Sequence, residues 1–254
     1  MGLFDKQKAK VRARAIGRIP SSHFNQLTIH SESRADVVFE NVRWDAISVI
    51  ASNLVGCTFK DVHAESVNLG EGLTQSTYTD CIFEGCNFAF GAIGNVRLAR
   101  CSFNRCRLFN FIGTKLEMID CTFPETRIQK AVFHRIFHSA VPGHIARDSN
   151  EFSGNDFSAA NLIDVDFRGG IELEKQVLPG GSEYIFVADT HLASELAHEL
   201  IAEVVQGSPD AKRLQSIRRM LERDHSTGQK QQLLRLTGCD SLTDTFRKKL
   251  NESF

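Results

Sequence analysis

The sequence predicts a β-solenoid, a coil of short parallel strands, followed by a helical C-terminal region. Two observations predict the solenoid: large apolar residues recur at every fifth position over much of the chain, and similar residues recur at every twentieth. A third predicts the helical region, because the five-residue period ends near residue 170 and apolar residues then follow helical spacing. We therefore expect a basic N-terminal arm or cap over 1–19, the solenoid over 20–170 and a mainly helical cap or interaction region over 171–254.

The five-residue period is clearest between residues 78 and 133. Stepping by five through this stretch meets a large apolar side chain at each position except Gly113, and the residue two places earlier is mostly small or apolar. Neither an α-helix, with about 3.6 residues per turn, nor a flat strand keeps such a register. Each unit is therefore expected to form one side of a coil. The stepped positions are Tyr78, Phe83, Phe88, Ile93, Leu98, Phe103, Leu108, Gly113, Met118, Phe123, Ile128 and Phe133.

A ladder of similar residues 20 positions apart indicates that four units complete one coil. The step is 24 between Phe59 and Phe83, which predicts a four-residue insertion near Gly70-Glu71-Gly72. It is again 24 between Phe133 and Phe157, which predicts an insertion of similar size near Val141-Pro142-Gly143. The predicted interior ladder consists of Phe39, Phe59, Phe83, Phe103 and Phe123, with Cys81, Cys101 and Cys121.

Residues 150–167 carry the most regular repeats and read NEFSGNDFSAANLIDVDF. In Ala160-Asn161-Leu162 and Asn155-Asp156-Phe157, Asn or Asp precedes the large apolar residue. The segment resembles the repeat of pentapeptide-repeat proteins. That resemblance implies a right-handed quadrilateral β-helix with four pentapeptides in each coil. It also implies, as the best-known activity of the family, DNA mimicry directed at a type II topoisomerase.

Residues 171–254 show helical signals instead. Asp189-Thr190 precedes an apolar stripe from Leu192 to Val205, and Ser208-Pro209 is a second helix start. We expect further helices around Leu233–Leu236 and around Leu242–Leu250, and a strand over 184–187. Such helices can cap the open end of the solenoid. Alternatively they join two copies, since the resemblance implies dimers formed through a C-terminal helical segment.

Charge is balanced over the whole chain, with 30 basic and 31 acidic residues, so no global field attracts nucleic acid or membrane. Residues 1–19 hold six basic residues and Asp5, a local excess of five positive charges. They predict either a basic arm for nucleic acid or an edge strand that caps the solenoid. Without a membrane span or a signal peptide, and with seven cysteines, we expect a cytoplasmic protein with reduced thiols.

The candidate chemistry argues against an enzyme. The cysteines of the repeat occupy inward positions and form no CxxC pair, so core packing is a better explanation than metal binding or nucleophilic catalysis. Gly70-Glu71-Gly72 lacks the Lys and the helix of a phosphate-binding loop. His134, His138 and His144 fall where the repeat breaks down and are interpreted as surface or loop residues. We expect no catalytic residue, no metal site and no cofactor.

The surface offers two kinds of candidate site. The first is the pair of interruptions, because a rigid scaffold concentrates function in its loops; the residues are Gly70, Glu71 and Gly72, and then His138, Gly143, His144 and Arg147. The second is the set of charged columns produced by stacking at 20: Asp80, Arg100 and Asp120; Lys115 and Arg135; and Arg105 above Glu125. Opposite charges alternate in two of these columns, which weakens any single-sign field.

Two functions follow. The sequence favours a non-enzymatic scaffold that binds a protein partner through the solenoid faces, the two interruptions and the helices, without sequence-specific nucleic-acid binding and without membrane contact. The alternative is a DNA mimic that binds a type II topoisomerase, DNA gyrase, and confers resistance to a topoisomerase poison. Mimicry requires a coherent anionic face.

Overall fold

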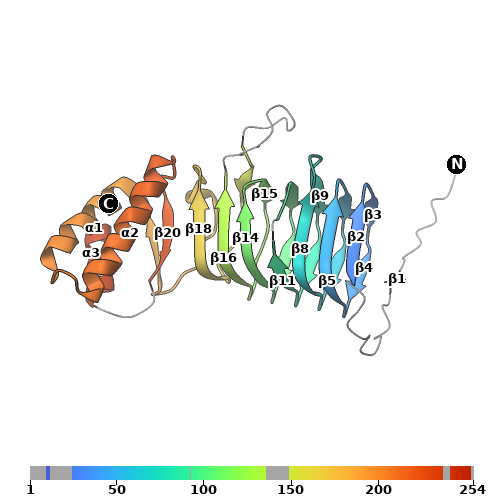
Figure 1. The fold of residues 1–254 in the computed structure, drawn as a ribbon, viewed down its shortest axis with the longest axis horizontal. Coiled ribbons are helices and arrows are strands. Elements are labelled where there is room, and N and C mark those ends of the chain that lie inside the picture. The colour runs from blue at the N-terminus through green and yellow to red at the C-terminus, as the bar shows by residue number, and fades with distance from the viewer. Residues whose placement is uncertain (1–9, 12–24, 92, 136–148, 237–240, 253–254) are drawn as a thin grey trace.

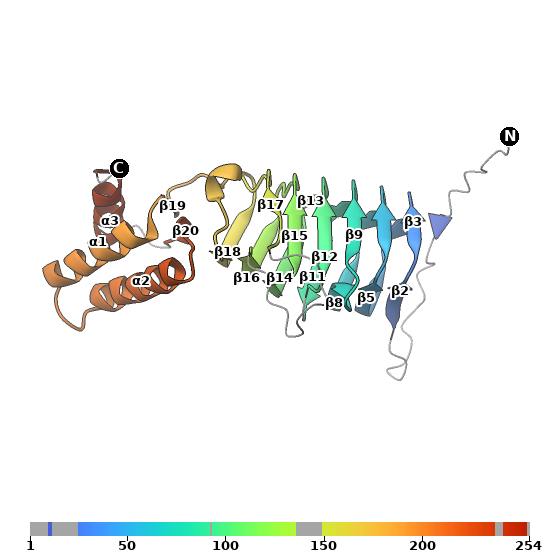
Figure 2. The same ribbon diagram turned by 90° about the horizontal axis from the view of Figure 1, so that it is seen from above.

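The molecule is a β-solenoid with a C-terminal helical unit at one end (Figure 1). This architecture confirms the predicted fold class. The computed structural model describes residues 10–11, 25–91, 93–135, 149–236 and 241–252. Figure 2 shows the strands stacked side by side along the long axis, with the helices beyond the last of them. All strand pairs in the solenoid are parallel, as expected when each strand pairs with its counterpart in the next coil.

Three parallel sheets enclose the interior. The five-stranded sheet contains β1 (Lys10–Val11), β4 (Val38–Glu40), β7 (Thr58–Lys60), β10 (Ile82–Glu84) and β13 (Ser102–Asn104). The seven-stranded sheet contains β2 (Gln26–His30), β5 (Arg43–Ile50), β8 (His63–Glu71), β11 (Asn87–Phe90), β14 (Arg107–Gly113), β16 (Arg127–His134) and β18 (Asn161–Arg168). The six-stranded sheet contains β3 (Ser33–Ala35), β6 (Asn53–Val55), β9 (Ser76–Thr79), β12 (Val96–Ala99), β15 (Leu116–Ile119) and β17 (Phe152–Ser153).

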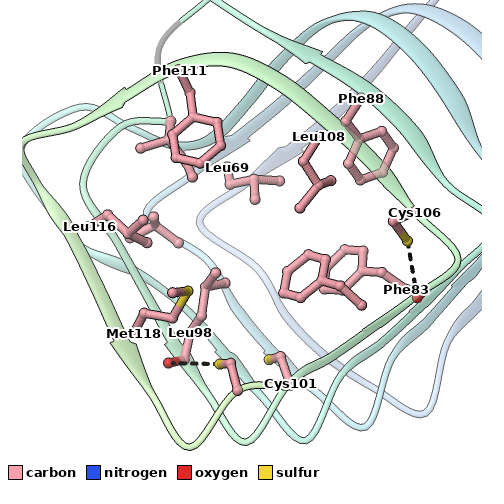
Figure 3. Packing of buried hydrophobic residues seen from close by; sticks show 14 of the residues in the cluster. Leu69, Phe83, Phe88, Leu98, Cys101, Cys106, Leu108, Phe111, Leu116 and Met118 are labelled. Carbon is pink, nitrogen blue, oxygen red and sulfur yellow. Dashed lines mark hydrogen bonds between the residues drawn. The ribbon is translucent and has the colours of Figure 1, made fainter. Parts of the chain in front are cut away.

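The four sides of each coil arise because the longer strands of the seven-stranded sheet run through two repeat units. β14, for example, includes both Leu108 and Gly113, which are inward positions of consecutive units. Figure 3 looks along the interior, where Leu116, Met118, Phe83 and Phe88 point inward from different sides. Apolar side chains fill this space from coil to coil, and their removal from water is the main stabilising contribution to the fold.

Phenylalanines form a continuous stack through the interior. Phe39, Phe59, Phe83, Phe103 and Phe123 follow one another, and Phe157 continues the stack. Their ring centroids are 4.5–5.2 Å apart, and the Phe83 and Phe103 rings are 2° from parallel. This separation is close to the strand spacing of about 4.8 Å. Each ring therefore occupies one coil and contacts the rings above and below it.

Buried cysteines fill the small inward positions and satisfy backbone groups there. The thiols of Cys81, Cys101 and Cys121 lie 3.5–3.6 Å from carbonyl oxygens of Leu54, Tyr78 and Leu98 in the preceding coil. Cys106 makes the same contact with the Phe83 carbonyl at 3.3 Å (Figure 3). Small size and a weak S–H donor explain why cysteine suits these positions.

Corners of the coil place many residues in the left-handed backbone region. Asp80, Arg100 and Asp120 occupy equivalent corners in three consecutive coils, each with φ of 52–53°. This conformation is unfavourable for side chains larger than glycine. The backbone N–H of each donates to a carbonyl of the next coil at 2.9–3.0 Å, which holds the turn in place.

The second insertion is larger than the sequence suggests. Phe123 stacks on Phe157, and Phe133 pairs with Phe167, so the step from one coil to the next here is 34. Cys121 and Asn155, which are hydrogen-bonded to each other, are separated by the same step. The expected pairing of Phe133 with Phe157 is therefore wrong, and the insertion is much longer than the predicted four-residue one. The first insertion does produce a step of 24, since Phe59 pairs with Phe83.

The C-terminal unit follows the short 3₁₀ helix Leu173–Lys175 and consists of three helices and a two-stranded sheet. The Asp189 side chain caps the N-terminus of α1 (Thr190–Glu203), as predicted. The Ser208 side chain likewise caps the N-terminus of α2 (Pro209–Ser226). α3 spans Ser241–Glu252 and β19 spans Tyr184–Val187. The helix expected around Leu233–Leu236 is wrong, because Gln232–Arg235 forms β20, antiparallel to β19. Leu192 and Val205, at the ends of the predicted stripe, are exposed.

Candidate functional site

Both insertions interrupt the solenoid along the same edge, where the seven-stranded sheet meets the six-stranded sheet. The first lies between the end of β8 at Glu71 and the start of β9 at Ser76, and Figure 1 shows the turn that it forms beside β9. The second lies between the end of β16 at His134 and the start of β17 at Phe152. We call this edge the insertion corner: residues 70–75, Asn95 and 149–151, with Arg97 and Glu117 beside them.

Asn95 closes the first insertion. Its side chain is 1% exposed, and its Nδ2 donates to the Leu73 carbonyl at 2.7 Å. Its backbone N–H donates to the Gly70 carbonyl at 2.5 Å, and its own carbonyl accepts from Ser76 at 3.0 Å. A Cβ on Gly70 would lie 2.2 Å from the Asn95 carbonyl oxygen, so glycine is required for this close approach. The inserted residues are thus anchored to the next coil.

Asn150 closes the base of the second insertion. This side chain is also 1% exposed, and its Nδ2 donates to the carbonyls of His134 at 2.7 Å and Thr114 at 3.0 Å. Its backbone N–H donates to the Arg135 carbonyl at 2.6 Å. The Asn150 N–H and the Arg135 carbonyl are thus in contact, so the chain leaves and rejoins the solenoid at one point.

A polar network on the six-stranded sheet connects the two insertions. Gln75, from the first insertion, donates to Glu117 Oε2 at 2.8 Å. The Arg97 guanidinium contacts Glu117 Oε2 at 3.2 Å and Glu151 Oε2 at 2.9 Å. The Glu151 N–H in turn donates to Glu117 Oε1 at 3.3 Å. Because the Glu117 side chain is only 9% exposed, this arrangement is held more rigidly than a surface ion pair.

The structure describes three of the seven predicted loop residues. Gly70 and Glu71 end β8, and Glu71 Oε2 accepts a 2.5 Å hydrogen bond from Ser48 Oγ. Gly72 follows with φ of 91°. The other predicted loop residues lie outside the described residues: His138, Gly143, His144 and Arg147. His134 ends β16 and is half-buried.

Sequence analysis did not single out Asn95, Asn150 or the network around Glu117. One signal was available for Asn150: it stands two residues before Phe152, an inward position that other repeats fill with Cys, Val or Ala. A buried amide there needs partners and therefore marks an irregular backbone. Asn95 and Glu117 carry no comparable signal, because their burial depends on where the insertion places the chain.

The predicted charged columns form local ion pairs. Arg100 binds Asp80 through two contacts of 2.7 and 3.0 Å, and this guanidinium holds the pKa of the Asp80 carboxyl below its usual range. Arg105 contacts Glu84 at 2.6 Å instead of Glu125. Arg135 reaches Glu172 at 2.7 Å, so its charge is compensated rather than added to that of Lys115. In these columns Arg100, Arg105 and Arg135 are each paired with a carboxylate.

The five-stranded sheet with its two flanking corners forms an acidic surface. It carries eight acidic residues (Asp36, Glu40, Asp61, Asp80, Glu84, Asp120, Glu125 and Asp156) and four basic ones (Lys10, Lys60, Arg100 and Arg105), a net charge of 4 − 8 = −4. Seven coils at about 4.8 Å spacing cover roughly 29 Å. Duplex DNA of that length carries about 17 charges, at one per ~1.7 Å. The charge density of this face is about a quarter of that of DNA.

The described residues offer little to catalysis. They include no group of three or more His, Cys, Asp or Glu side chains placed to hold a metal ion. Six cysteines are buried free thiols. Hydrogen bonding to a neighbouring thiol, together with burial, raises the pKa of Cys81 and of Cys101 to about 12, which disfavours the nucleophilic thiolate.

The C-terminal unit covers the last coil through a series of glutamines. Gln229 Oε1 accepts from the N–H groups of Gly170 and Ile171 at 3.0 and 2.9 Å, and Gln231 Oε1 accepts from that of Leu173 at 2.8 Å. Tyr184 Oη accepts from the Leu162 N–H at 2.9 Å, and Leu233 packs into the solenoid core. Backbone groups that would otherwise form an open strand edge are thereby satisfied. Across the residues that the structure describes, no helix has both the length and the apolar character needed to cross a bilayer.

The coil geometry decides the architecture: four five-residue units per turn, inward residues in register and left-handed corners between the sides. The solenoid is a four-sided β-helix built from five-residue units. No family model and no curated protein matches the sequence. Two solved structures are similar at low identity, and the fold assignment rests on the coil geometry rather than on them.

The first of these structures is QnrB1, described as a plasmid-mediated fluoroquinolone resistance protein. It is 15% identical, with 68% of this chain and 96% of QnrB1 covered and a TM-score of 0.25. The second is HetL, a pentapeptide-repeat protein involved in heterocyst differentiation regulation from the cyanobacterium Nostoc sp. strain PCC 7120. It is 11% identical, with 60% of this chain and 91% of HetL covered and a TM-score of 0.15.

Proposed function

We propose that this chain is a pentapeptide-repeat protein and a non-enzymatic scaffold that binds a protein partner at the insertion corner. The observation that carries the proposal is the convergence of two insertions, from coils far apart in sequence, on a single edge of the solenoid. Tolerated insertions would have no reason to share an edge or to be closed by buried amides. Function concentrates where loops are positioned by a rigid scaffold.

The network between the insertions supports the same proposal. This network lies between the two insertions and consists of Gln75, Arg97, Glu117 and Glu151. Its contacts join residues up to 54 positions apart in sequence. Leu73, in the first insertion, is 51% exposed and provides an apolar contact beside these polar groups. An apolar centre with a polar rim is the usual composition of a protein-binding surface.

The C-terminal unit acts in this proposal as a cap rather than as a dimerisation element, since the glutamines of residues 229–232 and Leu233 engage the last coil of the same chain. We place the scaffold in the cytoplasm. Cys81, Cys101 and Cys121 lie in consecutive coils as free thiols, an arrangement suited to a reducing compartment.

A photo-crosslinking experiment tests the proposal. Benzoylphenylalanine is placed at Leu73 in the full-length chain, and a matched control carries it at Ile82, which is 46% exposed on the five-stranded sheet. Irradiation in cells of the source organism is expected to give a defined protein adduct from position 73 and none from position 82. The same adduct should disappear when residues 137–148 are replaced by a short Gly-Ser linker. Equal adducts from both positions, or an adduct that survives loop replacement, would contradict a binding surface built from both insertions.

A second candidate function is DNA mimicry directed at gyrase, favoured by the net charge of −4 on the five-stranded sheet and its corners. The charge density argues for a weaker contact than duplex DNA makes. The test is gyrase supercoiling and quinolone-induced cleavage with increasing amounts of the purified protein. Inhibition or protection that is lost in the double variant Asp61→Asn, Asp120→Asn would support mimicry. Unchanged activity throughout the titration would exclude it.

A further inference from the structure

A shallow groove lies on a side of the solenoid that the proposed function does not use. It occupies about 350 Å³ on the outer face of the seven-stranded sheet. Its lining residues are Asn87, Arg107, Leu108, Phe109, Arg127 and Gln129. β11, β14 and β16 contribute them, and they therefore sit on neighbouring, rigidly paired strands.

Two arginines in this groove occupy an unfavourable position relative to each other. Arg107 and Arg127 are direct register partners on β14 and β16, so their side chains leave the sheet about one strand spacing, ~4.8 Å, apart. Like charges directly opposite one another on adjacent strands are destabilising. Both side chains are exposed, and Lys130 adds a third positive charge at the next corner.

Elsewhere on the solenoid, comparable stacking positions compensate their charges. Arg100 is paired with Asp80, Arg105 with Glu84 and Lys60 with Glu40. Among the described residues, no carboxylate lies within 4 Å of the guanidinium of Arg107 or of Arg127. Arg127 Nη2 donates to Gln129 Oε1 at 2.8 Å, which orients the guanidinium within the groove without neutralising it.

We propose that this groove binds a phosphate monoester group. Two neighbouring guanidiniums carry two positive charges, and a phosphate monoester carries close to two negative charges at neutral pH. Its three terminal oxygens match the planar, forked donors of arginine better than a single carboxylate does, and a carboxylate would leave one of the two charges uncompensated. Asn87 and Gln129 add neutral hydrogen-bonding groups beside the arginines, and Phe109 offers an apolar surface to whatever carries the phosphate.

Phosphodiesters fit the groove less well. Each phosphate of a nucleic acid carries one charge, and its neutralisation requires a basic track along the backbone. The same line of the seven-stranded sheet holds Asn161 on one side of the two arginines and Asn87 and His63 on the other, and the next arginine on the line, Arg43, is three strands away from Arg107. Only the arginines Arg107 and Arg127 are neighbours on this line, and a pair of adjacent arginines has a length suited to one anionic group.

Titration of the full-length protein with methyl phosphate and with dimethyl phosphate tests the proposal. Binding is followed through the Arg Nε–Hε signals in NMR spectra at low salt. Methyl phosphate is expected to shift the signals of Arg107 and Arg127, and dimethyl phosphate to bind about fivefold or more weakly because it carries half the charge. Arg107→Gln and Arg127→Gln should each weaken methyl phosphate binding about tenfold. Arg100→Gln removes the same charge from a paired arginine and is the control.

Three results would overturn the proposal: no saturable shift at Arg107 and Arg127, equal binding of the diester, or an equal loss of affinity in Arg100→Gln. A phosphoserine peptide and methyl phosphate then distinguish the source of the group. Tighter binding of the peptide supports a phosphorylated protein, and equal binding supports a small phosphorylated molecule. The circular dichroism spectrum of each variant confirms that these surface substitutions leave the solenoid folded.

Discussion

Asn95 and Asn150 both close an insertion of the solenoid with a buried side-chain amide: Asn95 donates to the Leu73 carbonyl within the first insertion, and Asn150 donates to the carbonyls of His134 and Thr114 at the base of the second. The two residues precede β12 and β17 of the same sheet. A buried carbonyl that loses its donor retains the cost of leaving water, whereas an exposed one does not. Both amides should therefore contribute to global stability as well as to loop position.

Substitution of either asparagine by alanine is expected to lower the free energy of unfolding by about 1–3 kcal/mol. The larger decrease should come from Asn150→Ala, because Asn150 Nδ2 donates hydrogen bonds to two carbonyls, those of His134 and Thr114. Urea denaturation followed by circular dichroism measures the change. Asn161→Ala, at an exposed position, is the matched control and should differ little from the wild type. Equal stabilities of Asn150→Ala and Asn161→Ala would contradict the assigned role.

Gly70→Ala should destabilise the solenoid by about 1–3 kcal/mol, because the added methyl group would lie 2.2 Å from the Asn95 carbonyl oxygen and backbone would have to move. Gly91→Ala offers a matched control. There the nearest atom to an added Cβ is Ser66 Oγ at 4.0 Å. Thermal unfolding of the two variants checks the difference; a tolerated Gly70→Ala would show that the first insertion is not held against Asn95.

The repeat pattern determined the architecture of the solenoid but not the size of the second insertion. A five-residue period gives the phase of the chain only to the nearest multiple of five. Steps of 24 and 34 residues differ by a multiple of five, so the five-residue period is the same for both. The sequence therefore cannot show whether Phe133 pairs with Phe157 or with Phe167; the structure pairs it with Phe167. The first insertion was readable because the phenylalanines continue in step on both sides of it.

Local helix signals were reliable where the capping residue itself was visible, as at Asp189 and Ser208. They failed at Leu233–Leu236, where pairing with β19 and packing of Leu233 on the last coil outweigh the helical preference of leucine. The sequence predicts the two insertions separately. That they lie on the same edge of the solenoid follows from the three-dimensional path of the coil, which the five-residue period alone does not give.

Thiol reactivity should report directly on the integrity of the core. The neighbouring thiol of Cys101 raises the pKa of Cys81 to about 12, and Cys101 is raised to about 12 mainly by Cys121. Iodoacetamide at about pH 8 is therefore expected to leave the six buried cysteines unmodified in the native protein and to alkylate them in denaturing urea. Peptide mass spectrometry identifies the modified sites. Rapid alkylation of Cys81 in the native state would contradict a closed core.

The Asp80–Arg100 pair should respond to acid. The pKa of Asp80 is lowered from its usual value of 3.8 by Arg100, so the folded-state pKa is lower than the unfolded one. The stabilisation is then complete at neutral pH and is lost as the pH falls through the folded-state pKa. Arg100→Gln is expected to return the pKa of Asp80 towards its usual value in carboxyl NMR titrations. Arg105→Gln, which removes a partner of Glu84 instead, should leave the Asp80 titration unchanged.

Gln229→Ala tests the closure of the last coil. The substitution removes the acceptor for the Gly170 and Ile171 N–H groups and the donor for the Ile171 carbonyl. We expect the free energy of unfolding to fall by about 2–4 kcal/mol, since several buried groups lose partners together. Gln26→Ala, near the opposite end of the solenoid and exposed, provides the comparison. A loss no greater than that of Gln26→Ala would mean that the helical unit does not depend on this contact.

The two insertions precede β9 and β17, which are separated by β12 and β15 in the six-stranded sheet. Three strand spacings of about 4.8 Å place them roughly 14 Å apart along the axis. That distance can change only in whole steps, because a coil is either present or absent. The number of complete coils therefore sets the distance between the two insertions. Evolution or design could change that distance by adding or deleting one complete coil, while the sequence of each insertion remained the same.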